Sequence, residues 1–233
     1  LTTEVGPRLA GTEAEARARA WAVQRLKAMG FSNVRIEGFD MPVWVRGEER
    51  AEITGATPQP IMLTALGNSG ATAPDGVEAE IVAFDSVAAL TAAPTERVRG
   101  KIVFVTHRMN KAQDGSSYAY FGPVRRVAPS LASQKGAAAI IIRSLGTDSH
   151  RFPHTGVQQW TDGAQPIPAA ALSNPDADQI ERLVAKGMPV RMRLLLTPRQ
   201  IGIRKSGNVI AEVPGTDRNA GIVLVGGHLD SWD

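Results

Sequence analysis

The sequence predicts an α/β fold, and three features of the 233-residue chain carry that prediction. Near the start, a run of helix-forming residues is bounded by cap signals. Further along, short apolar runs rich in β-branched residues alternate with helix-like segments, the order typical of α/β domains. The last of these runs, residues 222–225, is followed by two glycines, His228 and Asp230. Because ligands of open α/β sheets bind beyond the carboxyl ends of the strands, this run predicts both a buried central strand and a site.

The chain opens with a predicted helix followed by a strand. Thr12 and Glu15 have the spacing of a capping box, residues 14–29 are strong helix formers, and Gly30 is a typical helix stop. Beyond the glycine, apolar and charged residues alternate, which favours a strand with one wet face. We expect this opening helix–strand unit to run to about residue 54.

Residues 55–76 are rich in Gly, Pro, Thr and Asn, and they predict a boundary. Beyond them, strands and helices alternate, and this order predicts a parallel βαβ unit. Asn174 and Pro175 are expected to be the N-cap and the first helical residue of the second helix in this block. The predicted strands are 80–84, 101–105, 137–142, 167–172, 190–196 and 208–213, and the predicted helices are 125–135 and 176–186.

Composition excludes several classes of protein. The chain has no cysteine, so a disulfide scaffold, thiol catalysis and cysteine-ligated zinc are ruled out. The net charge is only +3, and aromatic residues, 5% of the chain, do not interleave with basic ones, so we expect no nucleic-acid partner. No apolar run approaches the roughly 20 residues of a membrane helix, and we expect no membrane partner.

The two ends suggest processing. The chain begins at Leu1 without an initiator methionine or a signal peptide, and it stops three residues after Asp230. We therefore expect it to be a piece of a longer protein.

The spacing of His228 and Asp230 has a chemical interpretation. In an extended chain, side chains at i and i+2 lie on the same side, about 6.5–7 Å apart along the backbone. The imidazole can bind a metal ion through one nitrogen while the carboxylate accepts from the other, which fixes the tautomer and raises the basicity of the ligand. The alternative is a histidine that merely follows a strand, with the aspartate starting a turn.

The other histidines are weaker candidates. His107 follows a predicted strand and is expected to be structural. His150 and His154 have i, i+4 spacing, but Pro153 lies between them and no His-Glu-x-x-His sequence is present. No Gly-x-Ser-x-Gly elbow, Walker loop or dinucleotide fingerprint occurs, so a serine hydrolase and a nucleotide-binding protein have no candidate site.

The run GGHLDSWD at 226–233 resembles the first metal motif of the co-catalytic zinc exopeptidases. Further runs resemble the glutamate carboxypeptidase branch of that family in the same order. They are VGPRLAGT at 5–12, WVRGEE at 44–49, IRS at 142–144, PHTG at 153–156 and NVIAEVPG at 208–215. Within the middle block, GKIVFV at 100–105, GAAAIII at 136–142 and IPAAALS at 167–173 resemble a protease-associated domain.

The resemblance implies a fold and a domain order. The expected fold is part of a three-layer αβα peptidase domain with an inserted protease-associated domain. Residues 1–57 would be the first segment of the peptidase domain, 58–198 the insertion, and 199–233 the return to the peptidase domain.

The resemblance also implies a function. Zinc is the expected cofactor, as two ions in the complete enzyme, and His228 would ligate one of them while Asp230 would be the catalytic carboxylate that orients this ligand. The expected reaction is hydrolysis of a short peptide by a metal-activated water, in a secreted or periplasmic protein that forms a homodimer. His154 would contact substrate or another subunit. The remaining ligands and the general base would lie beyond residue 233, so this chain alone is expected to be inactive.

Two alternatives stay open. One is a related zinc deacylase or amidohydrolase, which also uses His-x-Asp after a strand. The other is a non-catalytic module in which the middle block captures a peptide.

Overall fold

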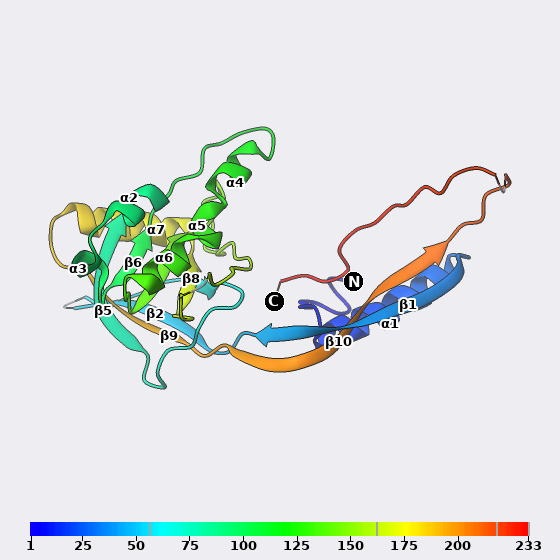
Figure 1. Cartoon of the computed structure of the whole chain (residues 1–233), viewed down its shortest axis with the longest axis horizontal. Helices are drawn as coiled ribbons and strands as arrows, with labels where there is room; N and C mark the ends of the chain where they lie inside the picture. Colours follow the sequence, from blue (N-terminus) through cyan, green and yellow to red (C-terminus); the bar gives the residue numbers. More distant parts are fainter. Residues whose placement is uncertain (56, 162, 218, 233) are drawn as a thin grey trace. The chain divides into compact units, whose positions relative to one another are not determined.

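The structure is a computed structural model that describes residues 1–55, 57–161, 163–217 and 219–232. Its internal contacts divide the chain into two compact units. The first consists of Leu1–Val45 with Gln200–Asp233, and the second of Arg46–Arg199. The chain contains both helices and strands, and the strands pair in parallel and antiparallel orientations (Figure 1). The prediction of an α/β fold class is therefore confirmed.

The first unit is built on one helix and a two-stranded sheet. Helix α1 (Glu13–Ala28) begins at Thr12, whose hydroxyl accepts a hydrogen bond from the Glu15 N–H, and Gly30 follows its end with φ +85°. Strand β1 (Ser32–Val45) pairs with β10 (Arg199–Glu212), and α1 lies along this pair (Figure 1). The predicted opening helix and strand are therefore confirmed, but the unit ends at Val45 and not near residue 54, because residues 46–54 belong to the second unit.

The turn into α1 is fixed by close packing. Gly11 has φ +75°, and a Cβ there would lie 2.3 Å from the Val43 Cγ2 atom, so only glycine fits. The Gly11 N–H donates to the Glu15 carboxylate at 3.4 Å, and that buried carboxylate pairs with Arg19 at 2.7 Å. The residues just before the helix are thereby held against β1.

The second unit contains an eight-stranded sheet in the order β3-β2-β9-β5-β6-β7-β8-β4. The central strands β5 to β8 are parallel, whereas β4, β9, β2 and β3 are added antiparallel at the two sides. The strands are β2 (Glu49–Thr54), β3 (Gln59–Pro60), β4 (Leu63–Ala65), β5 (Val77–Phe84), β6 (Ile102–Val105), β7 (Ala139–Arg143), β8 (Ala169–Leu172) and β9 (Arg191–Leu196). Strands β6, β7 and β8 are buried along their whole length, as uniformly apolar runs predict.

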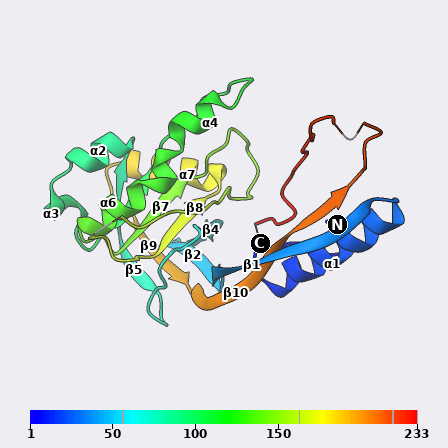
Figure 2. The same ribbon diagram turned by 45° about the vertical axis from the view of Figure 1, so that its right-hand side comes forward.

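Helices cover this sheet. The connections between the parallel strands carry α2 (Val87–Ala92), α3 (Thr95–Val98), α4 (Ser116–Phe121), α5 (Pro123–Arg126) and α6 (Ala128–Gln134), and Figure 2 shows α2, α4 and α6 gathered on one side. Their buried residues form one core with alternate strand residues such as Val103, Val105 and Ile140. Helix α7 (Asn174–Ala185) packs on β7, and its buried Ala177 and Ile180 lie outside that core.

Two local predictions need correction. The predicted helix 125–135 is two short helices, α5 and α6, with Pro129 in the first turn of the second. The N-cap of α7 is Ser173 and not Asn174, because the Ser173 hydroxyl accepts the hydrogen bond from the Asp176 N–H at 3.2 Å.

The predicted central strand at 222–225 is wrong for this chain. Among the described residues this segment pairs with no strand, and the four residues are 96%, 89%, 90% and 88% exposed. In the described part of the first unit the sheet consists of β1 and β10, and neither strand covers the apolar run or accepts its backbone hydrogen bonds.

Candidate metal centre

His228 and Asp230 contact each other in the segment that follows β10. The Nδ1 atom of His228 lies 2.9 Å from Oδ1 of Asp230. An ionised carboxylate can only accept, so in a neutral imidazole that donates Nδ1–H to Asp230 the lone pair is on Nε2. The His228 side chain is 91% exposed, so Nε2 is open to a ligand.

This donor set fits zinc. Imidazole nitrogen is a common zinc ligand, and a ligating histidine almost always donates its other N–H to a carboxylate or carbonyl. The His228–Asp230 contact has the form that is usual behind a ligating histidine, and the roles of the two residues remain a prediction. Within the part of the chain that the structure describes, no group of three or more histidine or acidic side chains could hold a metal ion together.

The metal motif is attached to the N-terminal segment through Arg8. The Arg8 Nε atom donates to the Leu229 carbonyl at 2.6 Å. The Arg8 N–H donates to the Ser231 hydroxyl at 3.2 Å, and the Ser231 N–H donates back to the Arg8 carbonyl at 3.1 Å. The chain thus returns from β10 to its own beginning (Figure 1). Sequence reasoning assigned Arg8 no role, although the run at 5–12 was one of those that carry the family resemblance.

The other histidines have separate partners. His107 packs edge-on against Phe121, with ring centroids 4.2 Å apart, and burial lowers the pKa of His107 against the opposing effect of Asp85. His150 lies 3.3 Å from Asp148. The structure does not bring His150 and His154 together on a helix, since the segment that carries them is neither helix nor strand.

His154 belongs to a hydrogen-bonded chain with a tyrosine and an arginine. Arg125 donates to the Tyr118 hydroxyl at 2.9 Å, and that hydroxyl lies 2.9 Å from the His154 Nε2 atom. Burial first, and then the charge of Arg125, lower the pKa of His154. A neutral imidazole that accepts from the tyrosine satisfies these contacts.

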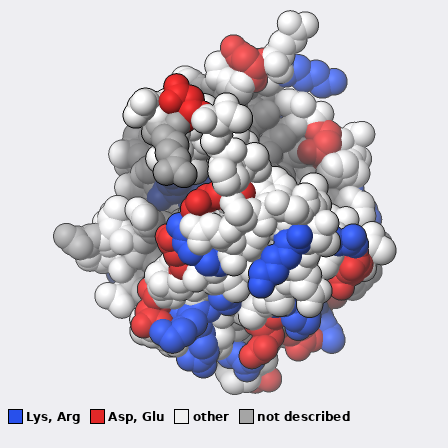
Figure 3. Space-filling model, turned by 90° about the vertical axis from the view of Figure 1, so that its right-hand side faces the viewer, with Lys and Arg blue, Asp and Glu red and all other residues white. Residues whose placement is uncertain are grey.

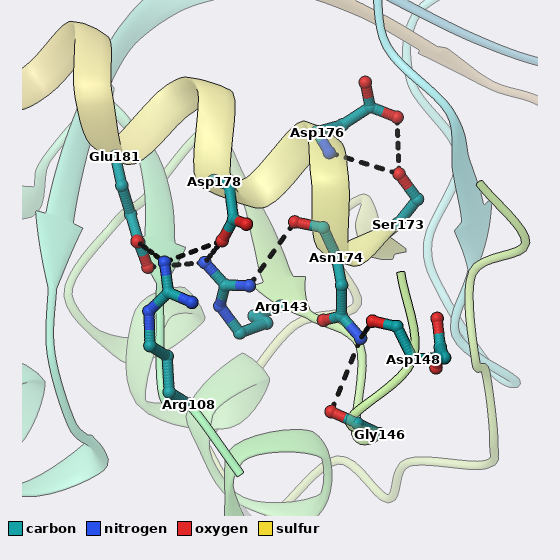
Figure 4. Close-up of polar contacts among 9 residues, drawn as sticks. All are labelled: Arg108, Arg143, Gly146, Asp148, Ser173, Asn174, Asp176, Asp178 and Glu181. Carbon is teal, nitrogen blue, oxygen red and sulfur yellow. Dashed lines mark hydrogen bonds and ion pairs between the residues drawn. The ribbon is translucent and has the colours of Figure 1, made fainter. Parts of the chain in front are cut away.

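A cluster of ion pairs joins α7 to the end of β7 and to the segment after β6 (Figure 4). The Arg143 side chain, only 4% exposed, pairs with Asp178 at 2.7 Å and Glu181 at 2.6 Å. Arg108, which is 60% exposed, pairs with the same two carboxylates. Asp178 and Glu181 each pair with both arginines, so these ion pairs hold α7 on β7.

On the face drawn in Figure 3, Lys and Arg side chains are interspersed with Asp and Glu. A mixed surface of this kind produces no strong field of one sign on that face. Among the described residues, no helix is both long and apolar enough to cross a membrane.

Comparisons with known proteins agree with the resemblance seen in the sequence. No family model matches the chain. The chain is 34% identical over all 233 residues to carboxypeptidase Q of Homo sapiens and 33% identical to that of Mus musculus, and it spans 48% of each relative, about half their length. A solved structure of a peptidase M28 precursor from Shewanella amazonensis matches with a TM-score of 0.95 and 44% identity, over 100% of this chain and 52% of that one. A zinc aminopeptidase from Bacillus subtilis matches in fold alone, with a TM-score of 0.55, 19% identity and coverage of 91% of this chain and 44% of that one.

These matches confirm the predicted resemblance to the co-catalytic zinc exopeptidases. Within that class, the chain is homologous to about half of carboxypeptidase Q.

Binding of zinc to the chain itself gives a first prediction. Zinc prefers about four ligands, and the metal motif offers one imidazole with its orienting carboxylate. Calorimetric titration of the 233-residue chain with zinc should therefore show at most weak binding, with a dissociation constant above about 1 µM. A stoichiometric site tighter than this would mean that the chain completes a metal shell that its fold does not display.

Proposed function

We propose that this chain is part of a zinc-dependent exopeptidase that hydrolyses short peptides with a metal-activated water. One observation carries the proposal: the His228–Asp230 pair, at 2.9 Å, lies in a chain that is similar over its whole length to carboxypeptidase Q. The remaining ligands and the general base would lie in the part of the full-length protein that corresponds to the half of the relatives outside this chain.

Each residue of the pair has its own task in this proposal. His228 would bind one of two zinc ions through Nε2. Asp230 would hold the Nδ1 proton, which keeps the ring in one tautomer and makes Nε2 a stronger donor. When bound, zinc lowers the pKa of a coordinated water towards 7 and polarises the scissile carbonyl.

We further propose that the middle of the chain is a protease-associated domain inserted into the peptidase domain. The support is that residues Arg46–Arg199 make a compact unit with its own sheet and core. Strand β2 pairs with β9 over six residues, Glu49 to Thr54, so we place the start of this domain before β2 rather than at residue 58.

Location and assembly are also part of the proposal. The word precursor in the name of the similar Shewanella protein supports export, and we propose a secreted or periplasmic protein. A homodimer is proposed from the family resemblance and is tested by sedimentation of the full-length protein.

The test of the function uses a full-length protein that carries this chain. We expect it to release terminal amino acids from dipeptides and short peptides, to lose turnover after chelation, and to regain it on addition of zinc. Hydrolysis of N-acylated amino acids without peptide hydrolysis would favour the deacylase. Peptide binding without any hydrolysis would favour the non-catalytic module.

The domain boundary gives a second prediction. Residues 46–199, expressed alone, should unfold cooperatively on heating, because they contain every strand of the eight-stranded sheet. A shorter piece, residues 58–198, lacks β2 and should melt at a lower temperature. Equal melting temperatures for the two pieces, followed by circular dichroism, would show that β2 is not part of this domain.

A further inference from the structure

We propose that Arg8 is a positioning residue for the metal motif. This proposal rests on the proposed function and deepens it, because it assigns the residue that fixes where His228 presents its free nitrogen. The hydrogen bonds of Arg8 go to Gly6, Leu229 and Ser231, so it acts through the chain next to the pair and not through a hydrogen bond to the imidazole or the carboxylate.

The contact that matters most is the one to Leu229, the middle residue of His-x-Asp. The Arg8 Nε atom donates to the Leu229 carbonyl at 2.6 Å, and Nη1 of the same guanidinium donates to the Gly6 carbonyl at 2.9 Å. A guanidinium is planar and rigid, so these two bonds fix the Leu229 peptide relative to the Gly6 peptide. The Leu229 carbonyl belongs to the peptide between Leu229 and Asp230, so the main chain is held next to Asp230, whose carboxylate lies 2.9 Å from the His228 Nδ1 atom.

A second pair of bonds anchors the other end of the motif. The Ser231 N–H donates to the Arg8 carbonyl at 3.1 Å, and the Ser231 hydroxyl accepts from the Arg8 N–H at 3.2 Å. Arg8 therefore holds residues 229–231 with both its side chain and its backbone. Side-chain substitution removes the first contact and leaves the second in place.

Exposure along the segment agrees with this anchoring. Residues 221–228 are exposed, whereas Leu229, Asp230 and Ser231 are partly buried. Residues 229–231, the part of the segment that hydrogen-bonds to Arg8, are therefore also the part that is partly buried. Without the guanidinium, the His228–Asp230 pair would sit at the end of a long exposed segment.

The backbone on both sides of Arg8 is constrained. Pro7 restricts the backbone just before it. After it, the Thr12 hydroxyl donates to the Leu9 carbonyl at 2.6 Å, and Gly11 packs on Val43 just before α1 begins. Contacts with helix α1 and strand β1 therefore fix the position of Arg8. Its hydrogen bond to Leu229, 221 residues away, fixes the metal motif relative to the same helix and strand.

The test measures backbone order in the metal-free 233-residue chain by ¹⁵N relaxation. In the wild type, amides of 229–231 should have order parameters near the rigid value of about 0.85. In Arg8→Ala those of 229 and 230 should fall below about 0.6, whereas 231, which keeps its bonds to the Arg8 backbone, should change less. Amides of α1 should be unchanged, because the substitution leaves the helix intact. The matched control is Arg35→Ala, which removes an exposed guanidinium from the same unit and should leave 229–231 rigid.

Two further measurements separate positioning from general stability. Arg8→Lys keeps the charge but lacks the planar fork, so it should restore the order of 229–231 only in part. The ¹⁵N shifts of the His228 ring should report protonated Nδ1 in the wild type and a mixture of tautomers in Arg8→Ala. If Arg8→Ala disorders α1 as well, Ser231→Ala takes its place and should loosen 231 while α1 stays ordered.

In the full-length protein, Arg8→Ala should weaken zinc binding about 10–100-fold, the usual effect of losing an outer support of a ligand. Unchanged order and unchanged ring shifts in a folded Arg8→Ala chain would overturn the positioning role, whatever the enzyme does. Loss of order in that variant, combined with zinc binding that does not need His228, would leave the positioning role standing and refute the proposed function.

Discussion

Replacing His228 by alanine in the full-length protein is expected to remove peptide hydrolysis almost completely. The substitution deletes the nitrogen that would bind zinc, so turnover should fall by more than the roughly 100-fold that the loss of an outer partner costs. Asp230→Asn should have the smaller effect, about 10–100-fold on turnover, with zinc still bound, because it changes only the acceptor behind the ligand.

The matched control for Asp230 is Asp217→Asn. Asp217 is an exposed aspartate in the segment after β10 whose carboxylate accepts from the Asn219 N–H and touches no part of the metal motif. Its replacement should leave turnover unchanged. An Asp230→Asn protein as active as this control would show that the carboxylate does not support the histidine.

The second large effect concerns stability and not chemistry. Arg143→Leu should lower the free energy of unfolding of the 233-residue chain by about 2–3 kcal/mol, measured by urea denaturation. Leucine keeps most of the buried volume but leaves Asp178 and Glu181 with Arg108 alone. The value lies below the roughly 3–5 kcal/mol of a fully buried pair because the two carboxylates reach solvent.

Arg108→Leu is the control for this prediction. It removes a guanidinium from the same carboxylates, but one that is 60% exposed, so the loss should be within about 1 kcal/mol. Equal losses for the two variants would mean that burial of Arg143 adds nothing to the pairing.

The free energy of unfolding of the wild type and that of Arg143→Leu should depend differently on pH in the acid range. Burial raises the pKa of Asp178, but hydrogen bonds and charge from Arg143 and Arg108 outweigh it, so the net pKa is lowered. A lowered pKa contributes stability above the unfolded value of about 3.9, and this stability is lost as the pH falls through the folded value. Arg143→Leu should therefore lose less stability on acidification than the wild type.

Local patterns in the sequence predicted much of the fold. Helix α1 and the buried strands β6, β7 and β8 follow from cap residues and from apolar runs, which act over a few residues. The short strands β3 and β4 were not predicted, because two or three residues carry no period. The N-cap of α7 moved by one residue, since Ser173 and Asn174 are both good caps and only the hydrogen bond decides.

The error at 222–225 has a different cause. An apolar run predicts that a segment is suited to burial, but burial itself needs neighbouring strands, which the two-stranded sheet of the first unit does not provide. In the candidate site too, local sequence predicts some features and contacts between distant residues decide others. The His228–Asp230 contact follows from i, i+2 spacing, whereas the support from Arg8 joins residues 221 positions apart and could not be read from local pattern.

The central claim is that His228 binds zinc through Nε2 with Asp230 behind it. Crystals of the full-length protein, measured on both sides of the zinc absorption edge, test this most directly. We expect an anomalous peak about 2.0–2.1 Å from the His228 Nε2 atom, the usual zinc–nitrogen distance, with Asp230 still bonded to Nδ1. A zinc peak that His228 does not touch would contradict the account.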